Sequence, residues 1–211
     1  NNGPLKTWEA MFPCPPPRKE TYLIDPRIEK CDRLMRQWNR VTPEVESIHE
    51  FNGEVPSESV TMQSLSFMNP GWLNLFGQAP SFNAYMADKN MEIAYAYEKR
   101  VLKLLQWKNP KGHWVLKTPI YILHMAQVLK IFPDACFIWT HRDPIKALSS
   151  VINTLGTLAW VRSDTPFIPG YYEDQTGSEA AAFMMSQPID WIEAGIVPRA
   201  QLCNVQYLDF V

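Results

Sequence analysis

The sequence predicts an α/β domain with a parallel sheet flanked by helices. Two observations lead to this fold class. Two short apolar segments of strand length, 113–117 and 135–140, are each followed by a segment of helical period. Strand, helix, strand and helix in this order form a βαβ unit, in which the strands run parallel and the helices cover the sheet. A third strand-like segment, 201–207, follows a further helical segment and extends the same pattern.

The first part of the chain is less regular. Up to Asp25 it is rich in proline, which excludes a regular helix. Asp25 followed by Pro26 is typical of a helix start, with Asp as the N-cap and Pro at the first helical position. We expect a helix from there to Asn39. Residues 41–82 are expected to be mostly irregular, with short helical pieces around 57–67.

From Asp88, a candidate N-cap, the pattern becomes regular. The segment 135–140 is apolar throughout, so we expect a strand covered on both faces, with Cys136 buried. A bend is expected near Pro188. The predicted elements are a helix at 88–107, a strand at 113–117, a helix at 119–132, a strand at 135–140, helices at 144–158 and 178–194, and a strand at 201–207.

Composition limits the function classes. The 211 residues, 46% of them hydrophobic, suffice for one domain, within which we separate an irregular region, 1–87, from an α/β core, 88–211. A net charge of −2 without a basic stripe argues against nucleic-acid binding. No apolar run reaches the roughly 18 residues of a membrane-spanning helix. Four widely spaced cysteines argue against a zinc site, and no metal is expected.

An anion site is predicted after the apolar strand. Arg142 lies at the carboxyl end of this strand, where ligands of open α/β sheets bind, and its guanidinium group suits a phosphate. Ser150 lies about two turns into the next helix and can lean back toward the same anion, and Ser149 is the neighbouring candidate. The helix start adds a partial positive charge. The alternative is that Arg142 pairs with Asp143 or another carboxylate and that both serines are ordinary helix residues.

The run 113–158, HWVLKTPIYILHMAQVLKIFPDACFIWTHRDPIKALSSVINTL, resembles the sulfotransferases that use 3′-phosphoadenosine-5′-phosphosulfate (PAPS), in particular their bacterial-type branch. The segments TWEA at 7–10 and VQYLD at 205–209 resemble the same branch. The resemblance implies a sulfotransferase fold of the P-loop NTPase type, with PAPS as donor and adenosine 3′,5′-bisphosphate as product. It places the 3′-phosphate site on Arg142 and Ser150.

Two features of the family pattern are missing from the 211 residues. The glycine-rich loop of the type Pro-Arg-(Ser/Thr)-Gly-Thr-Thr, which holds the 5′-phosphosulfate, is expected upstream of Thr7 and does not occur. The glycine-containing loop that follows the last strand is also absent. We therefore expect a fold that is incomplete at both ends and holds half of the cofactor site.

The catalytic candidates are Lys117, Glu9 and His49. Lys117 ends a predicted strand and resembles the lysine that contacts the transferring group in cytosolic relatives; the alternative is a surface lysine. Those relatives place a basic His two residues later, where this chain has Pro119. Glu9 matches a glutamate of the bacterial-type branch and is our first candidate for the base, against the alternative of a solvated residue or helix cap. His49 is the second candidate.

An apolar acceptor pocket is a further hypothesis, with core packing as its alternative. It would favour a phenol, sterol, lipid or glycolipid over an anionic polysaccharide. Its candidate lining residues are Trp72, Phe76, Phe82, Tyr85 and Met86.

The resulting functional prediction is sulfuryl transfer from PAPS to a hydroxyl or amine of a small-molecule or lipid-like acceptor. The alternative is a non-catalytic sulfotransferase-like subunit of a larger assembly. A nucleotide-phosphate kinase would need a GxxxxGK[ST] loop and magnesium, neither of which the chain calls for. A homo-oligomer is left open. Cysteine usage favours the cytoplasm, and a removed leader would allow the Golgi or an organelle.

Overall fold

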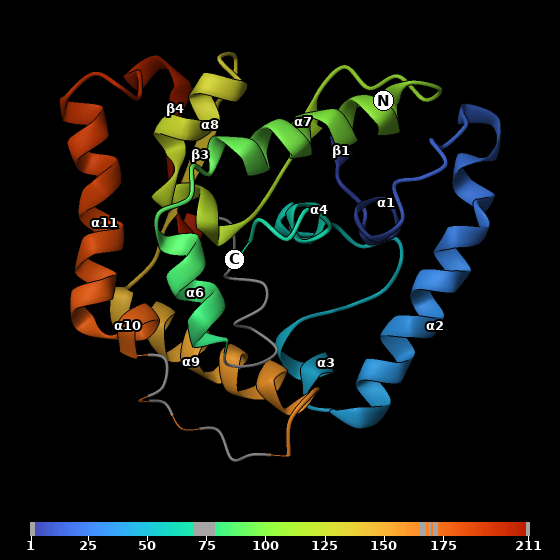
Figure 1. Ribbon diagram of the computed structural model, residues 1–211, viewed down its shortest axis with the longest axis horizontal. Helices are drawn as coiled ribbons and strands as arrows, with labels where there is room; N and C mark the ends of the chain where they lie inside the picture. The colour runs from blue at the N-terminus through green and yellow to red at the C-terminus, as the bar shows by residue number, and fades with distance from the viewer. Residues whose placement is uncertain (1–2, 70–78, 165–167, 169, 171–172, 210–211) are drawn as a thin grey trace.

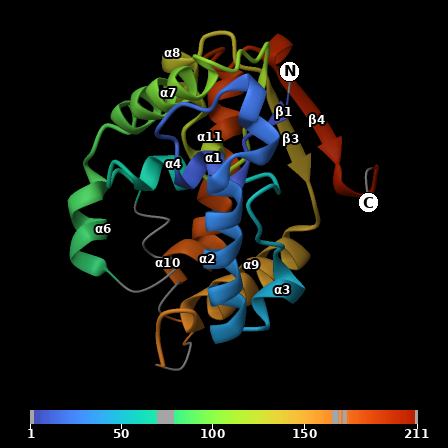
Figure 2. The ribbon, with the colours of Figure 1, turned by 90° about the vertical axis from the view of Figure 1, so that its right-hand side faces the viewer.

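The strands of the protein pair in parallel in the computed structural model (Figure 1). The structure describes residues 3–69, 79–164, 168, 170 and 173–209. β1 (Gly3–Pro4) pairs with β2 (Trp114–Val115), and β3 (Phe137–His141) pairs with β4 (Leu202–Gln206). Figure 2 shows β3 and β4 running side by side along one side of the molecule. Parallel strands linked through helices confirm the predicted α/β class.

The remaining described elements are helices. The helix predicted at 178–194 is present, with Pro188 inside it. The α-helices are α1 (Thr7–Met11), α2 (Pro26–Val41), α3 (Val45–Ile48), α4 (Val60–Ser64), α6 (Pro80–Ala87), α7 (Glu92–Gln106), α8 (Met125–Ile131), α9 (Pro144–Trp160), α10 (Glu173–Thr176) and α11 (Ser178–Glu193). The 3₁₀ helices are η1 (Lys19–Ile24), η2 (Pro119–Leu123), η4 (Arg199–Gln201) and η5 (Tyr207–Asp209).

Of the two predicted N-caps, Asp25 is confirmed and Asp88 is not. Asp25 caps α2 as predicted, because its side chain accepts a hydrogen bond from the Arg27 N–H at 3.0 Å. Asp88 does not start the next helix; it is the C-cap of α6. The Asn90 side chain instead accepts from the Glu92 N–H at 2.9 Å, so α7 begins a turn later than predicted.

The helix predicted at 119–132 is divided into η2 and α8. The break falls at His124, whose φ of −139° and ψ of 21° are not helical. The break places two rings against α7: the Tyr121 hydroxyl donates to Glu98 at 2.6 Å, and His124 Nδ1 bonds the Tyr95 hydroxyl at 2.8 Å. Contacts with α7 therefore override the continuous helical pattern of the sequence.

The expectation that β3 is covered on both faces was wrong. Ile138 is 69% exposed and Cys136 is also exposed, whereas Phe137 packs against a buried cluster. The side chains of a strand alternate between its two faces, so one face of β3 packs on the core. Within the described ranges no element covers the other face.

The core is organised around α7, which contributes to two of its three clusters. Burial of these side chains is the main stabilising contribution to the fold. The first cluster holds Leu5, Ala10, Met62, Val101, Leu102 and Leu105; the second holds Met86, Met91, Ala94, Tyr95 and Val128; the third holds Trp8, Cys31 and Met35.

Two ionisable groups are also buried against α7. Glu98 is fully buried, and desolvation raises the pKa of its carboxyl to about 7. Desolvation lowers the pKa of His124 to about 4. Each group is therefore more easily neutral in the folded protein than in the unfolded chain, and the two have opposite effects on the pH dependence of stability.

The Glu98→Gln variant should separate these effects. Glu98 destabilises the fold progressively as pH rises from about 4.5 to about 7, because the unfolded chain releases the proton first. His124 acts in the opposite direction between about 4 and 6.5, so the wild-type profile should be nearly flat there. In Glu98→Gln only the His124 effect remains, and the free energy of unfolding should rise with pH by up to about 3 kcal/mol. Urea denaturation between pH 4.5 and 7.5 measures this.

The control is Glu193→Gln, which removes an exposed carboxyl group. It should keep the wild-type profile. Parallel profiles for wild type and Glu98→Gln would contradict the burial of an ionisable Glu98.

Candidate functional site

Arg142 connects β3 to α9 and is exposed. The Asp143 carboxylate does not pair with it; this side chain caps α9 by accepting from the N–H groups of Ile145 at 2.9 Å and Lys146 at 3.2 Å. The guanidinium of Arg142 instead lies over the ring of Tyr207, 4.5 Å from the ring centroid. Within the described ranges Arg142 has no ion pair, so the proposed alternative of an Arg142–Asp143 pair was wrong.

The two serines of α9 differ in their contacts. Ser149 Oγ donates to the Ile145 carbonyl at 2.8 Å, a bond within the helix. The Ser150 hydroxyl is exposed and forms no hydrogen bond with any described residue. Ser150 is therefore the serine whose hydroxyl is available to a ligand near the start of α9.

Lys117 lies two residues beyond β2 and forms an ion pair with Glu58. The two residues also form a parallel bridge, and the Ser59 N–H donates to the Lys117 carbonyl at 2.9 Å. The Lys117 side chain is 65% exposed and that of Glu58 is 24% exposed. An exposed ammonium group beside a partly buried carboxylate can serve both charge stabilisation and proton transfer.

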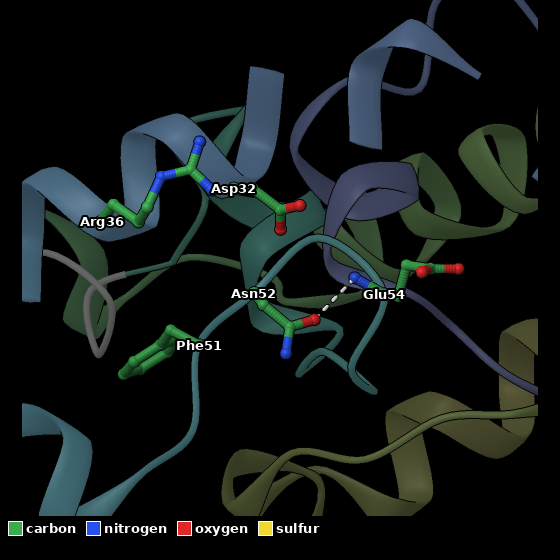
Figure 3. Close-up of a pocket in the computed structure, with 5 residues that line it drawn as sticks. All are labelled: Asp32, Arg36, Phe51, Asn52 and Glu54. Atoms are coloured by element: carbon green, nitrogen blue, oxygen red, sulfur yellow. Dashed lines mark hydrogen bonds between the residues drawn. The ribbon is translucent and has the colours of Figure 1, made fainter. Parts of the chain in front are cut away.

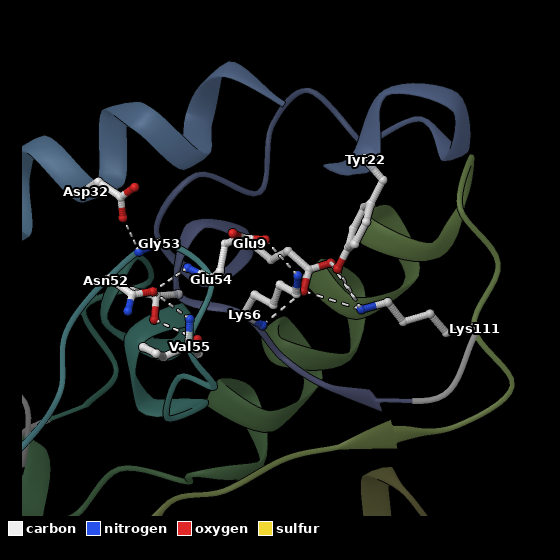
Figure 4. Close-up of polar contacts among 10 residues, drawn as sticks. Lys6, Glu9, Tyr22, Asp32, Asn52, Gly53, Glu54, Val55 and Lys111 are labelled. Carbon is white, nitrogen blue, oxygen red and sulfur yellow. Dashed lines mark hydrogen bonds and ion pairs between the residues drawn. The ribbon is translucent and has the colours of Figure 1, made fainter. Parts of the chain in front are cut away.

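Glu9, the first candidate for the base, is completely buried in α1 (Figure 4). Its carboxylate accepts from Lys111 Nζ at 3.1 Å, from the Tyr22 hydroxyl at 3.0 Å and from the Lys6 N–H at 3.0 Å. Burial lowers the pKa of Lys111 and the Glu9 charge partly opposes that effect. These contacts support an anchoring role for Glu9 rather than the predicted role as a base.

His49, the second candidate, is two residues from Phe51, which lines a pocket of about 350 Å³ (Figure 3). Its ring stacks on Phe51, a pocket-lining residue, with 4.4 Å between centroids, and its Nδ1 bonds the Glu50 carbonyl at 2.9 Å. The pocket lining is mostly polar. It consists of Asp32, Arg36, Phe51, Asn52 and Glu54.

The hydrogen bonds shown in Figure 4 fix the rim of this pocket. Asp32 accepts from the Gly53 N–H at 2.6 Å, and Asn52 Oδ1 accepts from the N–H groups of Glu54 and Val55 at 2.9 and 3.0 Å. A side chain at Gly53 would have its Cβ 2.8 Å from the Ile28 carbonyl oxygen, so the loop can approach α2 only with glycine there.

The predicted apolar acceptor pocket is not formed by the candidates that can be placed. Trp72 and Phe76 lie outside the described residues. Met86 belongs to the core, Tyr85 is 59% exposed beneath the Lys89 ammonium, and Phe82 packs against the core cluster of Met86. For Met86 and Phe82 the alternative of core packing holds.

A sequence model described as the sulfotransferase family matches residues 9–211. The chain belongs to this family. No curated protein matches it.

Two mycobacterial sulfotransferases of known structure are similar to this family member. It is 25% identical to sulfotransferase STF9 from Mycobacterium avium, with a TM-score of 0.75 over 98% of this chain and 52% of the other. It is 20% identical to sulfotransferase STF1 from Mycobacterium tuberculosis H37Rv, with a TM-score of 0.74 over 98% of this chain and 55% of the other. The chain thus spans about half the length of these relatives. The likeness confirms the predicted sulfotransferase fold.

No helix in the described part is both long and apolar enough to cross a membrane. Among the same residues, no group of three or more His, Cys, Asp or Glu side chains is placed to hold a metal ion.

Removing Lys111, the cation that pairs with Glu9, should destabilise the fold. In Lys111→Met the buried Glu9 carboxylate loses its cation, and we expect the free energy of unfolding to fall by about 3 kcal/mol. The matched control is Lys130→Met, which breaks the more exposed pair with Glu92 and should leave the free energy of unfolding nearly unchanged. Urea denaturation at pH 7 compares the two, and equal losses would contradict the anchoring role.

Proposed function

We propose that this sulfotransferase transfers a sulfuryl group from PAPS to a hydroxyl or amine group of a small acceptor, and that it holds the 3′-phosphate of PAPS at the β3–α9 junction. One observation carries the proposal. Arg142 is exposed at the start of a 17-residue helix, and no described carboxylate pairs with it. The family assignment and the fold shared with the mycobacterial sulfotransferases support the reaction class.

The residues at the junction fit a phosphate group. The planar guanidinium of Arg142 can donate two parallel hydrogen bonds to phosphate oxygens, and its charge persists at any working pH. The Ser150 hydroxyl is available as a further donor, whereas Ser149 is engaged within the helix. The start of α9 adds a favourable field for an anion. PAPS, when bound, supplies a sulfuryl group attached to a phosphate leaving group.

Lys117 and Glu58 are proposed to act on the reacting groups. Sulfuryl transfer forms a bond between sulfur and the acceptor oxygen or nitrogen, breaks the bond between sulfur and the phosphate oxygen, and releases the acceptor proton. Lys117 stabilises the charge on the transferring and leaving oxygens, as cations do in phosphoryl transfer. Glu58 replaces Glu9 as our candidate for the base because it contacts Lys117 and is partly exposed. His49 stays a prediction.

The acceptor is proposed to be neutral or cationic. The described pocket near His49 is lined by two carboxylates, Asp32 and Glu54, and one guanidinium, Arg36, and this excess of negative charge would disfavour an anionic polysaccharide. The lipid-like acceptor suggested by the aromatic residues at 72–86 stays a prediction, because part of that segment lies outside the described residues.

The competing proposal is a non-catalytic sulfotransferase-like subunit. It predicts that the β3–α9 junction has no affinity for the product nucleotide, because a retained fold does not require a retained site. Binding of adenosine 3′,5′-bisphosphate therefore distinguishes the two.

Replacing Arg142 tests the phosphate site. We expect Arg142→Ala to weaken the binding of adenosine 3′,5′-bisphosphate about tenfold or more, because a charge-assisted contact with two hydrogen bonds is lost. Ser150→Ala should weaken it by a smaller factor. Titration calorimetry with the full chain measures both, with 5′-AMP as the ligand that lacks the 3′-phosphate.

Arg199→Ala is the matched control, since it removes an exposed arginine from η4, away from the junction in sequence. It should bind the bisphosphate like the wild type. Unchanged affinity in Arg142→Ala would contradict the assignment of the 3′-phosphate site, and absence of binding in the wild type would favour the non-catalytic subunit.

Replacing Lys117 tests the catalytic assignment separately. Lys117→Ala should lower kcat about a hundredfold, with 4-nitrophenol as acceptor probe, because transition-state charge loses a preorganised cation. Its affinity for the bisphosphate should stay within about twofold of the wild type. Lys130→Ala removes another exposed, ion-paired lysine and should retain full activity. If Lys117→Ala loses affinity for the bisphosphate but keeps its kcat, the catalytic role of Lys117 is contradicted.

A further inference from the structure

A buried carboxyl group without a cation lies close to the candidate catalytic lysine in the hydrogen-bond network. Glu98, in the middle of α7, is fully buried. It accepts from the Tyr121 hydroxyl at 2.6 Å and from Gln63 Nε2 at 2.6 Å, and Gln63 in turn accepts from Asn69 at 2.7 Å. Burying such a group is unfavourable unless it is fully hydrogen-bonded, and here each carboxylate oxygen has a donor.

The network continues from Glu98 to Lys117. The Tyr121 oxygen accepts from Ser59 Oγ at 2.7 Å, and Ser59 is itself fully buried. The Ser59 N–H donates to the Lys117 carbonyl at 2.9 Å. The residue before Ser59 is Glu58, which forms the ion pair with the Lys117 side chain. Two side-chain bonds and one backbone bond therefore connect the carboxyl group of α7 to Lys117.

We propose that Glu98 is a positioning residue that acts through Tyr121 and Ser59 to hold Glu58 and Lys117 together. The catalytic part of this inference rests on the role proposed for Lys117 above. Glu98 itself contacts none of the groups proposed to react. Its contribution is to fix the one segment that carries both the Ser59 amide and the Glu58 carboxylate.

The direction of the hydrogen bonds makes the arrangement sensitive to the Glu98 proton. Ser59 donates to Tyr121, Tyr121 donates to one Glu98 oxygen and Gln63 donates to the other, so both carboxylate oxygens act as acceptors. A proton on the oxygen facing Tyr121 would turn that oxygen into a donor. The bonds from Glu98 to Ser59 would then have to reverse, and the Ser59 hydroxyl would need another acceptor.

The surroundings indicate where this change falls on the pH scale. The titratable groups that face Glu98 are Tyr121 from η2 and Tyr95 from α7, with His124 bonded behind Tyr95; α4 contributes the neutral Gln63. None of them is a cation that would favour the carboxylate. Desolvation accordingly raises the pKa of Glu98 to about 7, within the working range of an enzyme.

The test compares two tyrosines whose rings lie close together. Tyr121→Phe removes the hydroxyl that joins Glu98 to Ser59. Tyr95→Phe is the matched control: its ring lies 6.0 Å from that of Tyr121 and its hydroxyl is also buried, but its partner is His124. We expect the acetylation rate of Lys117 by N-hydroxysuccinimide acetate, followed by mass spectrometry, to rise about threefold or more in Tyr121→Phe only. Lys130 in the same protein is the internal reference.

Activity and pH give the second measurement. Tyr121→Phe should lower kcat for transfer from PAPS to 4-nitrophenol about tenfold, with KM for PAPS within about twofold of wild type, and Tyr95→Phe should change neither. The wild-type ratio of Lys117 to Lys130 acetylation should change around pH 7. Glu98→Gln, which cannot titrate, should remove that change. Ser59→Ala serves as a second interruption of the network if Tyr121→Phe does not fold.

The outcomes separate this inference from the proposed function. An unchanged Lys117 acetylation rate in Tyr121→Phe, or in Ser59→Ala, would overturn the positioning role whatever the activity. A raised rate in a protein that shows no sulfuryl transfer would support the positioning and contradict the proposed reaction. A raised rate together with a lower kcat supports both.

Discussion

The Glu9 carboxylate joins three segments that are far apart in the sequence, and the arrangement of the site depends on it. It binds the backbone of Lys6, the hydroxyl of Tyr22 and the ammonium of Lys111, with almost no access to water. Lys6 forms an antiparallel bridge with Pro56, which begins the segment carrying Glu58. An ion pair shielded from solvent is strong only while both partners are present, so the α1 region and the segment that reaches Lys117 are stabilised together.

Helix starts could be predicted from the sequence where neighbouring residues determine them. Asp25 and Asp143 each cap a helix with a proline at its first position, and both helices begin where the sequence indicates. The division of the helix at His124 could not be predicted, because it arises from hydrogen bonds to α7, nearly 30 residues earlier in the chain. The apolar character of 135–140 predicted a strand but could not show which face would be packed, as exposed Ile138 demonstrates.

The residues of the candidate site also differ in whether neighbouring sequence or tertiary contacts determine them. Arg142 and Ser150 could be predicted because the end of a predicted strand and the first turns of the following predicted helix are close together in the sequence. The pairing of Glu58 with Lys117 could not be predicted, because it spans 59 positions and no periodicity reports it. For Glu9 the helix-cap alternative holds, since its carboxylate accepts from the Lys6 N–H, but its burial and the approach of Lys111 are consequences of tertiary packing that the sequence does not report. Glu98 gave no signal beyond a single acidic residue on an otherwise apolar helix face.

The stacking of Arg142 on Tyr207 has a consequence for the thermodynamics of anion binding. The aromatic ring has already displaced water from one side of the guanidinium and restricts the rotation of the side chain. An anion that approaches the other side therefore meets a cation that is partly dehydrated and oriented before contact. Much of the ordering entropy has been lost during folding, so the association retains more of the enthalpy of its hydrogen bonds.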